Sequence, residues 1–201
     1  MGKVFNVIFS LVLLVLFSPL FLIVGVMIKL NSKGPVFFTQ MRIGRNNELF
    51  KFYKFRTMKI GTPNVATDKL DSSISYVTKT GKILRKTSID ELPQIINILK
   101  GDMTFVGPRP ALYNQYELKE LRTKAGVHKL LPGVTGWAQI NGRDNNNDYE
   151  KTQHDSDYLN NKSLWLDIRI VFRTVFKVLR AEGILDGAHQ HQKSESKDVS
   201  A

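Results

Sequence analysis

An uninterrupted apolar segment near the N-terminus constrains this chain more than any other feature. Residues 4–28, VFNVIFSLVLLVLFSPLFLIVGVMI, contain no charged side chain. About 20 apolar residues suffice for a helix to cross the hydrocarbon core of a bilayer. The segment is longer than the ~7 to 15 residue apolar core of a signal peptide, and LNSKGPVFF follows it where a small-residue cleavage site would be needed. The sequence therefore predicts a retained membrane segment.

The dipeptide Ser18-Pro19 lies in the middle of this segment. Pro19 has no N–H to donate to the carbonyl of Val15, and its ring crowds the preceding turn, so a helix that continues through it should kink. The Ser18 hydroxyl can bond back to the carbonyl of Leu14 and ease the break. A kinked helix that spans the bilayer and a re-entrant helix that returns to the same face both fit. Cations flank both ends of the segment, which favours a cytoplasmic location for both.

Charge and composition limit the partners of the whole chain. Its 201 residues, enough for one domain with a sizeable core, include 29 Lys and Arg against 18 Asp and Glu, a formal net charge of +11. This excess predicts an anionic partner such as nucleic acid, lipid headgroups or a phosphorylated substrate. The chain contains no Cys, which excludes disulfides and thiolate metal sites.

A β-hairpin is predicted directly after the membrane segment. PVFFTQMRIG and ELFKFYKFRTM are rich in aromatic and β-branched residues, and Arg45-Asn46-Asn47 supplies a turn between them. Lys54, Arg56 and Lys59 lie on the second strand or just after it. They either contact phosphate or remain solvated on an exposed face near anionic lipid. Residues 60–76 are predicted to form a polar loop.

Two adjacent acids, Asp90 and Glu91, occur in the stretch SIDELPQ. Ser88 and Glu91 match a capping box, and Asp90 would complement the positive end of a helix. A helix that started at Ser88 would need an N–H from Pro93, whereas a start at Asp90 places Pro93 where no hydrogen bond is lost. In either case both acids lie at the start of a helix that ends at Gly101. Capping is thus one explanation of the pair.

Two arginines lie in loops downstream of these acids, and the loop of Arg109 is stiff. Arg109 stands between two prolines in GDMTFVGPRP, and Arg143 ends the glycine-punctuated stretch LPGVTGWAQINGR. A rigid loop presents a guanidinium in a fixed place, which suits bidentate binding of phosphate.

Phosphate-binding arginines beside paired carboxylates indicate that a divalent cation also binds at this site. The carboxylates would repel phosphate unless a divalent cation lay between them, and Mg²⁺ needs only one or two protein carboxylates. Consecutive helical residues point about 100° apart, so one acid can bind metal while the other attacks phosphorus. A glycosidase pair fits less well, because its acids must flank one bond at roughly 5 to 9.5 Å.

These motifs resemble those of a known family. DELPQIINILKGDMTFVGPRP and PGVTGWAQINGR, preceded by an apolar segment with a central Ser-Pro, are similar to the monotopic phosphoglycosyltransferases, the bacterial sugar transferase family. The resemblance extends over nearly the whole chain, from about residue 1 to about residue 180, and favours the small members that are little more than a catalytic core. It implies transfer of sugar-1-phosphate from a nucleotide diphosphate sugar, commonly a UDP-sugar, to polyprenol phosphate at the cytoplasmic face of the bacterial inner membrane. The products would be nucleoside monophosphate and a lipid-linked sugar, in the first membrane step of glycoconjugate biosynthesis.

The resemblance also implies residue roles, with Mg²⁺ as the cofactor. Asp90 would be the nucleophile that forms a phosphosugar intermediate, and Glu91 would hold the Mg²⁺. The remaining residues expected at the substrate are Arg109, Arg85, Arg143, Lys54 and Asp155. Asp155 matches a family acid only loosely, and Asp157 is an equal candidate. The family pattern further favours the re-entrant membrane helix over the spanning one.

The last periodic segment, SLWLDIRIVFRTVFKVLR, predicts an amphipathic helix. Its cationic stripe consists of Arg169, Arg173, Lys177 and Arg180. Its apolar face contains Trp165, Ile168, Phe172 and Phe176. Periodicity fits either an interfacial helix or a core-packed helix with a solvated basic face, and the membrane segment favours the former. The polar tail is expected to be disordered, and its His189 and His191 lack further ligands for a metal.

The sequence thus predicts an α+β protein with a membrane-embedded re-entrant helix at 1–30, a cytoplasmic catalytic domain with interfacial helices at 31–185 and a disordered tail at 186–201. Two other functions stay open. One is a membrane-anchored module that binds anionic lipid or nucleic acid, although no aromatic-rich RNA motif or recognition helix supports nucleic acid. The other is a membrane hydrolase that would pass the phosphosugar to water.

Overall fold

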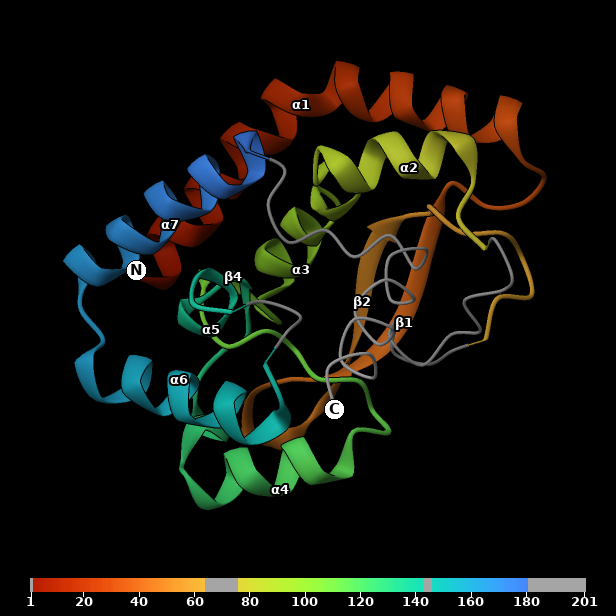
Figure 1. Cartoon of the computed structure of the whole chain (residues 1–201). Coiled ribbons are helices and arrows are strands. Elements are labelled where there is room, and N and C mark those ends of the chain that lie inside the picture. The colour runs from red at the N-terminus through yellow and green to blue at the C-terminus, as the bar shows by residue number, and fades with distance from the viewer. Residues whose placement is uncertain (1, 64–75, 143–145, 181–201) are drawn as a thin grey trace, which may run out of the picture.

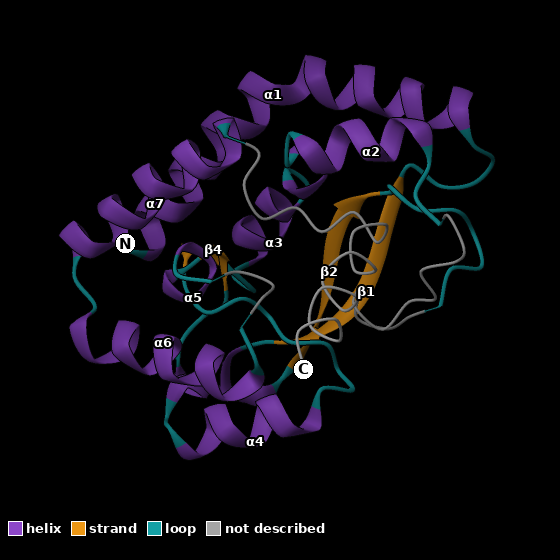
Figure 2. Cartoon of the chain, in the orientation of Figure 1, coloured by secondary structure: helices purple, strands orange, loops and turns teal. Residues whose placement is uncertain are grey.

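The computed structural model describes residues 2–63, 76–142 and 146–180. Helices predominate, and the strands form two small sheets (Figures 1 and 2). The helices are α1 (Lys3–Asn31), α2 (Lys79–Lys86), α3 (Gln94–Lys100), α4 (Tyr116–Lys124), α5 (Trp137–Ile140), α6 (Asp148–Asn161) and α7 (Leu164–Leu179). The strands are β1 (Phe37–Ile43), β2 (Leu49–Phe55), β3 (Thr104–Val106) and β4 (Gly133–Thr135), and 3₁₀ turns lie at η1 (Arg45–Asn47), η3 (Ile89–Glu91) and η4 (Val127–Lys129). This arrangement confirms the predicted α+β class.

Helix α1 is the membrane candidate. It is the one helix in the described part of the chain that is long and apolar enough to cross a membrane, and only 11% of its most apolar stretch is buried. The helix continues through Pro19, so Ser18-Pro19 does not interrupt it, although its ribbon changes direction along its length (Figure 1). The Ser18 hydroxyl donates to the carbonyl of Val15 at 2.8 Å, one residue nearer than the expected Leu14.

Both ends of α1 contact the rest of the protein. Near its start, Asn6 Nδ2 donates to Thr104 Oγ1 at 2.9 Å. Near its end, Val24 and Ile28 are buried in a cluster with Phe55. Between these contacts the helix exposes large apolar side chains, namely Leu11, Val12, Val15, Leu16, Leu22 and Ile23. The helix is therefore fixed at both ends and uncovered in the middle.

Arg56 fixes the chain where it leaves α1. Its buried guanidinium donates from Nη2 to the carbonyl and the hydroxyl of Ser32, each at 2.8 Å, and from Nη1 to the carbonyl of Lys33 at 2.7 Å. Because Arg56 directly follows β2, these bonds tie the exit of the apolar helix to the hairpin. Arg56 therefore fits neither predicted use, phosphate contact or a solvated strand face, because its guanidinium is buried and bound within the protein.

The hairpin forms where the sequence predicts it. Strands β1 and β2 pair antiparallel, from Phe37 opposite Phe55 to Ile43 opposite Leu49. Asn46 in the turn has a φ of 55°, a left-handed conformation that Asn tolerates better than most residues. One face of β2 packs on α3 through a cluster that contains Phe50, Phe52, Ile98 and Met103. The hairpin thereby positions the helix that follows the acid pair.

The acid pair does not cap a helix. Ser88 has a left-handed backbone (φ 56°) and makes no side-chain cap bond, and Asp90 and Glu91 form the 3₁₀ turn η3. Helix α3 begins only after Pro93, which is its N-cap and offers no side-chain cap bond. The predicted end is confirmed, since Gly101 ends α3 with a φ of 84°. The capping box at Ser88 and the helix start at Asp90 are therefore both wrong, and the acids need another explanation.

The C-terminal part packs on the short parallel sheet of β3 and β4. The two strands approach so closely at Gly133 that a Cβ there would lie 2.1 Å from the N atom of Gly107. Only glycine fits at this position. Ile170 of α7 is fully buried in the adjoining core. The opposite side of α7 leaves Trp165 (75%), Ile168, Phe172 and Phe176 exposed. The core-packed alternative therefore does not account for the apolar stripe of α7.

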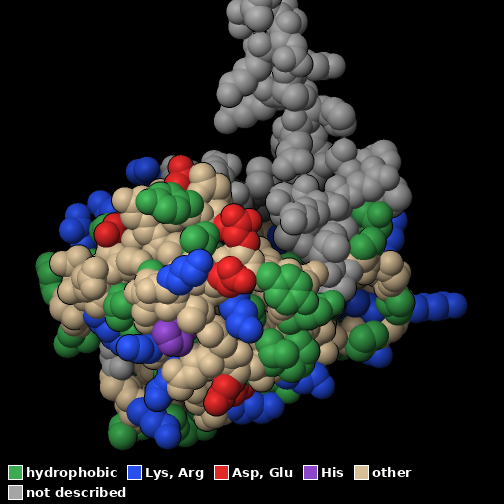
Figure 3. Space-filling view, turned by 90° about the horizontal axis from the view of Figure 1, so that it is seen from below, with side chains coloured by type: hydrophobic (Ala, Val, Ile, Leu, Met, Phe, Trp, Pro, Cys, Tyr) green, Lys and Arg blue, Asp and Glu red, His purple; other side chains and the backbone are tan. Residues whose placement is uncertain are grey.

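The face on the side of α4 and α6 carries charged side chains (Figure 3), whereas the middle of α1 exposes apolar ones. Acidic and basic side chains are interspersed there (Figure 3). Of the predicted polar loop, the structure describes only residues 60–63 and 76. Three other predictions fall outside the described residues, and they concern Arg143, the tail at 186–201, and His189 and His191 within that tail.

Candidate active site

Asp90 and Glu91 lie where three segments meet. Lys54 comes from β2, the acids from η3, and Arg109 from the loop after β3. Lys54 Nζ lies 2.6 Å from Glu91 Oε1, and Arg109 Nη2 lies 3.0 Å from the same oxygen. Lys54 Nζ is also 3.7 Å from Asp90 Oδ2. The structure therefore brings together four residues that the sequence predicted for the site.

Glu91 is held in its ionised form. Its side chain is 20% exposed, and burial alone would raise the pKa of the carboxyl group. The charges of Lys54 and Arg109 and their hydrogen bonds outweigh burial and hold the pKa of Glu91 well below its usual range. Glu91 is thus a permanent negative charge clamped by two cations.

Asp90 has a contrasting environment. It is 7% exposed, and burial raises the pKa of its carboxyl group above the ordinary value. The charge of Lys54 opposes this rise, and that of Glu91 adds to it. Within the described residues, Lys54 is its ion-pair partner, at a distance too long for a hydrogen bond. A poorly solvated carboxylate with few hydrogen bonds retains its basicity, as a nucleophile requires.

Arg85 approaches Asp90 from the last turn of α2. Its charge lowers the pKa of Asp90, which places its field at that carboxylate. Its Nη1 is buried and has no hydrogen-bond partner in the described part of the chain. The structure thus supports the prediction that Arg85 lies near the acids. Its Nη1 group could donate a hydrogen bond to a ligand.

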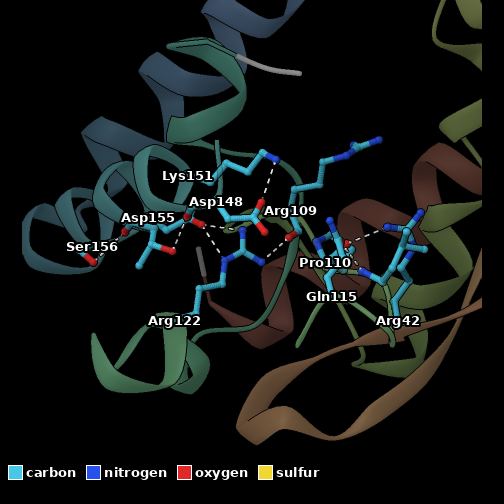
Figure 4. A network of polar contacts seen from close by, with 11 residues as sticks. Arg42, Arg109, Pro110, Gln115, Arg122, Asp148, Lys151, Asp155 and Ser156 are labelled. Carbon is cyan, nitrogen blue, oxygen red and sulfur yellow. Dashed lines mark hydrogen bonds and ion pairs between the residues drawn. The ribbon is translucent and has the colours of Figure 1, made fainter. Parts of the chain in front are cut away.

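The loop that carries Arg109 is held from behind by two other arginines (Figure 4). Arg42 Nη1 donates to the carbonyl of Pro110 at 3.1 Å, and Arg122 Nη1 donates to the carbonyl of Arg109 at 2.8 Å. Asp155 accepts from Arg122 Nε and Nη2 at 2.9 and 2.6 Å. These bonds fix the backbone of the loop, so its rigidity does not depend on the prolines alone.

Asp155 therefore supports the loop, whereas the sequence placed it at the substrate. Its side chain is 1% exposed and bound to Arg122, and Asp157, the other candidate, is exposed on α6. Sequence reasoning missed both Arg122 and Arg42. Arg122 lies in YELKELRTK, where it looks like one more cation of a polar helix, and Arg42 looks like a strand cation facing solvent.

Arg42 adds positive potential beside Arg109. Burial and the charge of Arg109 lower the pKa of Arg42 to about 9, and the charge of Glu91 opposes this. Its Nε is buried and has no hydrogen-bond partner among the described residues. Its guanidinium also lies 5.2 Å from the centre of the Phe52 ring, a cation–π distance. The charges of the two guanidinium groups add to a positive potential that favours anions near this loop.

The carboxylates fit a Mg²⁺ ion that is bound together with phosphate. The described residues contain no group of three or more His, Cys, Asp or Glu that could hold a metal alone. Mg²⁺ often needs only one or two protein carboxylates when substrate phosphates complete its shell. Lys54 and Arg109 both donate to Oε1 of Glu91. The other carboxylate oxygen, Oε2, is of the type that Mg²⁺ prefers as a ligand.

Comparisons with known proteins give a matching family and relatives of named activity. The model of a family described as bacterial sugar transferase matches residues 1–181. The UDP-N-acetylgalactosamine-undecaprenyl-phosphate N-acetylgalactosaminephosphotransferase of Aeromonas hydrophila is 40% identical over 89% of this chain and 43% of the relative. The UDP-glucose:undecaprenyl-phosphate glucose-1-phosphate transferase of Escherichia coli (strain K12) is 40% identical over 86% of this chain and 39% of the relative.

The chain thus spans about two-fifths of the length of those two relatives. Its size is closer to that of the uncharacterized sugar transferase EpsL of Bacillus subtilis (strain 168). That protein is 41% identical over 93% of this chain and 91% of its own length.

Proposed function

The chain belongs to the bacterial sugar transferase family, and from this premise we propose that it transfers a sugar-1-phosphate from a nucleotide diphosphate sugar to polyprenol phosphate. The relatives from Aeromonas hydrophila and Escherichia coli are named for UDP-sugars and undecaprenyl phosphate, which favours a UDP-sugar and a long polyprenol here. The observation that carries the proposal is the buried carboxylate of Asp90 beside Glu91, which Lys54 and Arg109 clamp.

In the first proposed step, a carboxylate oxygen of Asp90 attacks the phosphorus that bears the sugar. A new bond forms between that oxygen and phosphorus, and the phosphoanhydride bond to the nucleotide breaks. Nucleoside monophosphate leaves with the bonding electron pair. Arg109, Arg85 and Lys54 lie where they can neutralise charge on the phosphate oxygens. The product of this step is an aspartyl-phosphosugar.

In the second proposed step, a phosphate oxygen of the polyprenol phosphate attacks the same phosphorus. The bond to Asp90 breaks, and the carboxylate is restored. The product is polyprenyl-diphosphate-sugar, so atoms and charge balance without any further reactant. Burial of Asp90 supports this order, because limited access of water protects the acyl phosphate from hydrolysis.

Mg²⁺ is proposed as the cofactor, with Glu91 as its protein ligand. When bound, it would neutralise diphosphate charge next to the two carboxylates. The proposed task of Glu91 is to present a carboxylate that stays ionised over the working pH range, which its low pKa supports. Lys54 and Arg109 orient that carboxylate.

We also propose that α1 enters and leaves the membrane on the cytoplasmic face. A straight 29-residue helix would measure about 43 Å, enough to separate its two ends by a bilayer core of about 30 Å. Both ends nevertheless contact the same domain, through Asn6 at Thr104 and through Ile28 beside Phe55. A spanning helix could not make both contacts from opposite faces of a bilayer. The apolar middle would then insert into one leaflet.

The test is detection of the covalent intermediate. Purified protein is incubated with UDP-sugars and Mg²⁺, and the peptide that contains Asp90 is examined by mass spectrometry for a phosphosugar adduct. We expect the adduct, with release of UMP, and its removal on addition of polyprenol phosphate. Transfer to lipid without any adduct at Asp90 would refute the proposed mechanism.

The same assay separates the other two functions. A hydrolase would release free sugar phosphate whether or not polyprenol phosphate is present. A membrane-anchored binding module would bind anions through its cations, and Asp90 and Glu91 would be dispensable. The opposite pKa shifts of these two acids favour the transferase over that module.

A further inference from the structure

A basic pocket lies at the other end of α3 from the acid pair. It encloses about 520 Å³. Cations line it from five separate parts of the chain, and they are Lys3, Arg45, Lys100, Lys129 and Lys162. No carboxylate lines it. Asp102, the residue after Gly101, is instead hydrogen-bonded to the Asn97 amide at 3.3 Å. The pocket therefore attracts anions.

The cations differ in how firmly they are held. Lys100 Nζ donates to Tyr53 Oη at 2.9 Å and lies 4.7 Å from the centre of the Tyr53 ring, so it already has a partner in the protein. Lys3, Lys129 and Lys162 are exposed side chains from α1, η4 and the turn before α7. Such lysines can close around a phosphate from several sides.

Apolar side chains also line the pocket. Val7, Ile98 and Leu130 contribute to the lining. Asn6 also lines it and is 6% exposed. Its Nδ2 donates to Thr104, while its Oδ1 is buried and has no hydrogen-bond partner in the described residues. Cations together with apolar side chains suit an amphiphile with a phosphate headgroup better than a free inorganic anion.

The position of the pocket indicates where the amphiphile comes from. Lys3 belongs to the first turn of α1, where Phe5 and Ile8 are exposed. Lys162 lies just before α7, where Trp165 is 75% exposed. If these apolar surfaces enter the bilayer as proposed above, the pocket lies at the depth of the lipid headgroups.

We propose that this pocket binds the headgroup of an anionic glycerophospholipid from the surrounding membrane. The phosphate lies among Lys3, Lys129 and Lys162, and the start of the acyl chains lies on the apolar wall. The lipid is distinct from the acceptor substrate, whose phosphate must reach Asp90, because α3, about 10 Å long, separates the pocket from the acid turn. This inference uses the proposed membrane placement and does not depend on phosphosugar transfer.

The experiment compares two charge reversals in the full chain. The protein is reconstituted in nanodiscs of equimolar phosphatidylcholine and phosphatidylglycerol, then released and analysed by native mass spectrometry for retained lipid. We expect wild type to retain phosphatidylglycerol selectively. The double variant K129E/K162E should lower that adduct at least about tenfold, because each basic residue contributes to binding at an anionic lipid surface.

The matched control is K51E/K124E. It changes the net charge equally, and both side chains are exposed and outside the pocket. Retention as in wild type supports the proposal, whereas equal loss in both variants overturns it in favour of general charge attraction. Displacement of the phosphatidylglycerol by inorganic phosphate would overturn it in favour of a soluble anion. Displacement by polyprenol phosphate would identify the pocket as an acceptor site and overturn it as well.

Phosphosugar transfer is assayed separately in detergent. K129E/K162E should keep transfer within about twofold of wild type, since neither lysine contacts the acid pair, whereas a larger loss overturns the assignment of a separate lipid site. If wild type retains phosphatidylglycerol and shows no transfer with any nucleotide sugar, the proposed function fails while the lipid site stands.

Discussion

Asp90 and Glu91 are adjacent in the chain, and the protein shifts their pKa values in opposite directions. Burial dominates at Asp90, which Lys54 approaches only to 3.7 Å. At Glu91 two cations at 2.6 and 3.0 Å overcome burial. The 3₁₀ turn makes this difference possible, because it points the two side chains into different surroundings. One acid is left basic and the other is left ionised, which matches the proposed division between nucleophile and metal ligand.

Asp90→Asn should abolish transfer and preserve the fold. We expect a fall in activity of at least ~10³-fold, because the amide cannot form the phosphosugar bond. The pKa of Asp90 is raised above 3.8 in the folded protein, so the protonated carboxyl group favours folding and the ionised one opposes it. The stabilising contribution of the protonated form is present below pH 3.8 and is lost as pH rises through the folded pKa. The variant should therefore have a Tm at or above that of wild type at pH 7, with the difference shrinking toward pH 3.8. Thermal unfolding and UMP release measure the two effects.

Glu91→Gln should behave in the opposite way with pH. The folded pKa of Glu91 lies below its ordinary 4.5, so its contribution to stability is present above pH 4.5 and is lost as pH falls. The variant leaves Lys54 and Arg109 partly buried without their carboxylate, which should cost about 1–3 kcal/mol at pH 7. The difference from wild type in urea unfolding should shrink below pH 4.5. A constant difference at all pH values would contradict the ion-pair assignment.

Sequence reasoning found the parts of the site and misjudged how they are held. Adjacency indicated the acids and loop rigidity indicated Arg109, whereas Lys54 was considered for its charge and Arg85 followed only from the family resemblance; the structure brings them together. The local capping pattern at Ser88 was misleading because tertiary contacts, not the helix end, decide the backbone there. The support of the Arg109 loop could not be read, since Arg42 and Arg122 are 67 and 13 residues away from it and look like surface cations in sequence. Hairpin and helix end, which depend on local residue types, were predicted well.

The pair of Arg122 and Asp155 should act on catalysis through the loop that carries Arg109. Asp155→Asn removes the charge that holds Arg122, and breaking a buried ion pair typically costs about 3–5 kcal/mol. We expect kcat to fall and KM for the nucleotide sugar to rise, although Asp155 lies away from the acids. The control is Lys151→Ala, whose ion pair with Asp148 on the same helix is partly exposed and worth at most ~1 kcal/mol. Steady-state kinetics and unfolding of both variants check this, and unchanged kinetics in folded Asp155→Asn would exclude a positioning role.

The path of α1 can be tested because the chain has no Cys. Single variants Gly2→Cys and Lys33→Cys place a thiol just outside each end of the helix, at exposed positions. In sealed inner-membrane vesicles of known orientation, a membrane-impermeant maleimide should label both thiols from the cytoplasmic side. Labelling of the two from opposite sides would establish a spanning helix and remove the re-entrant proposal. Neither substitution touches the acid pair, so transfer activity serves as the control for folding.

The two sides of α7 should respond differently to substitution, because one is packed and the other is exposed. Phe172→Ser changes a side chain that is 65% exposed, so it should leave the free energy of unfolding within about 0.5 kcal/mol and weaken membrane association. Ile170→Ala removes methyl groups from a fully buried position and should cost about 2–5 kcal/mol. Flotation with liposomes and urea unfolding distinguish these results. Equal destabilisation by both would mean that the apolar stripe of α7 is covered by protein, and unchanged flotation of Phe172→Ser would mean that this stripe does not contact lipid.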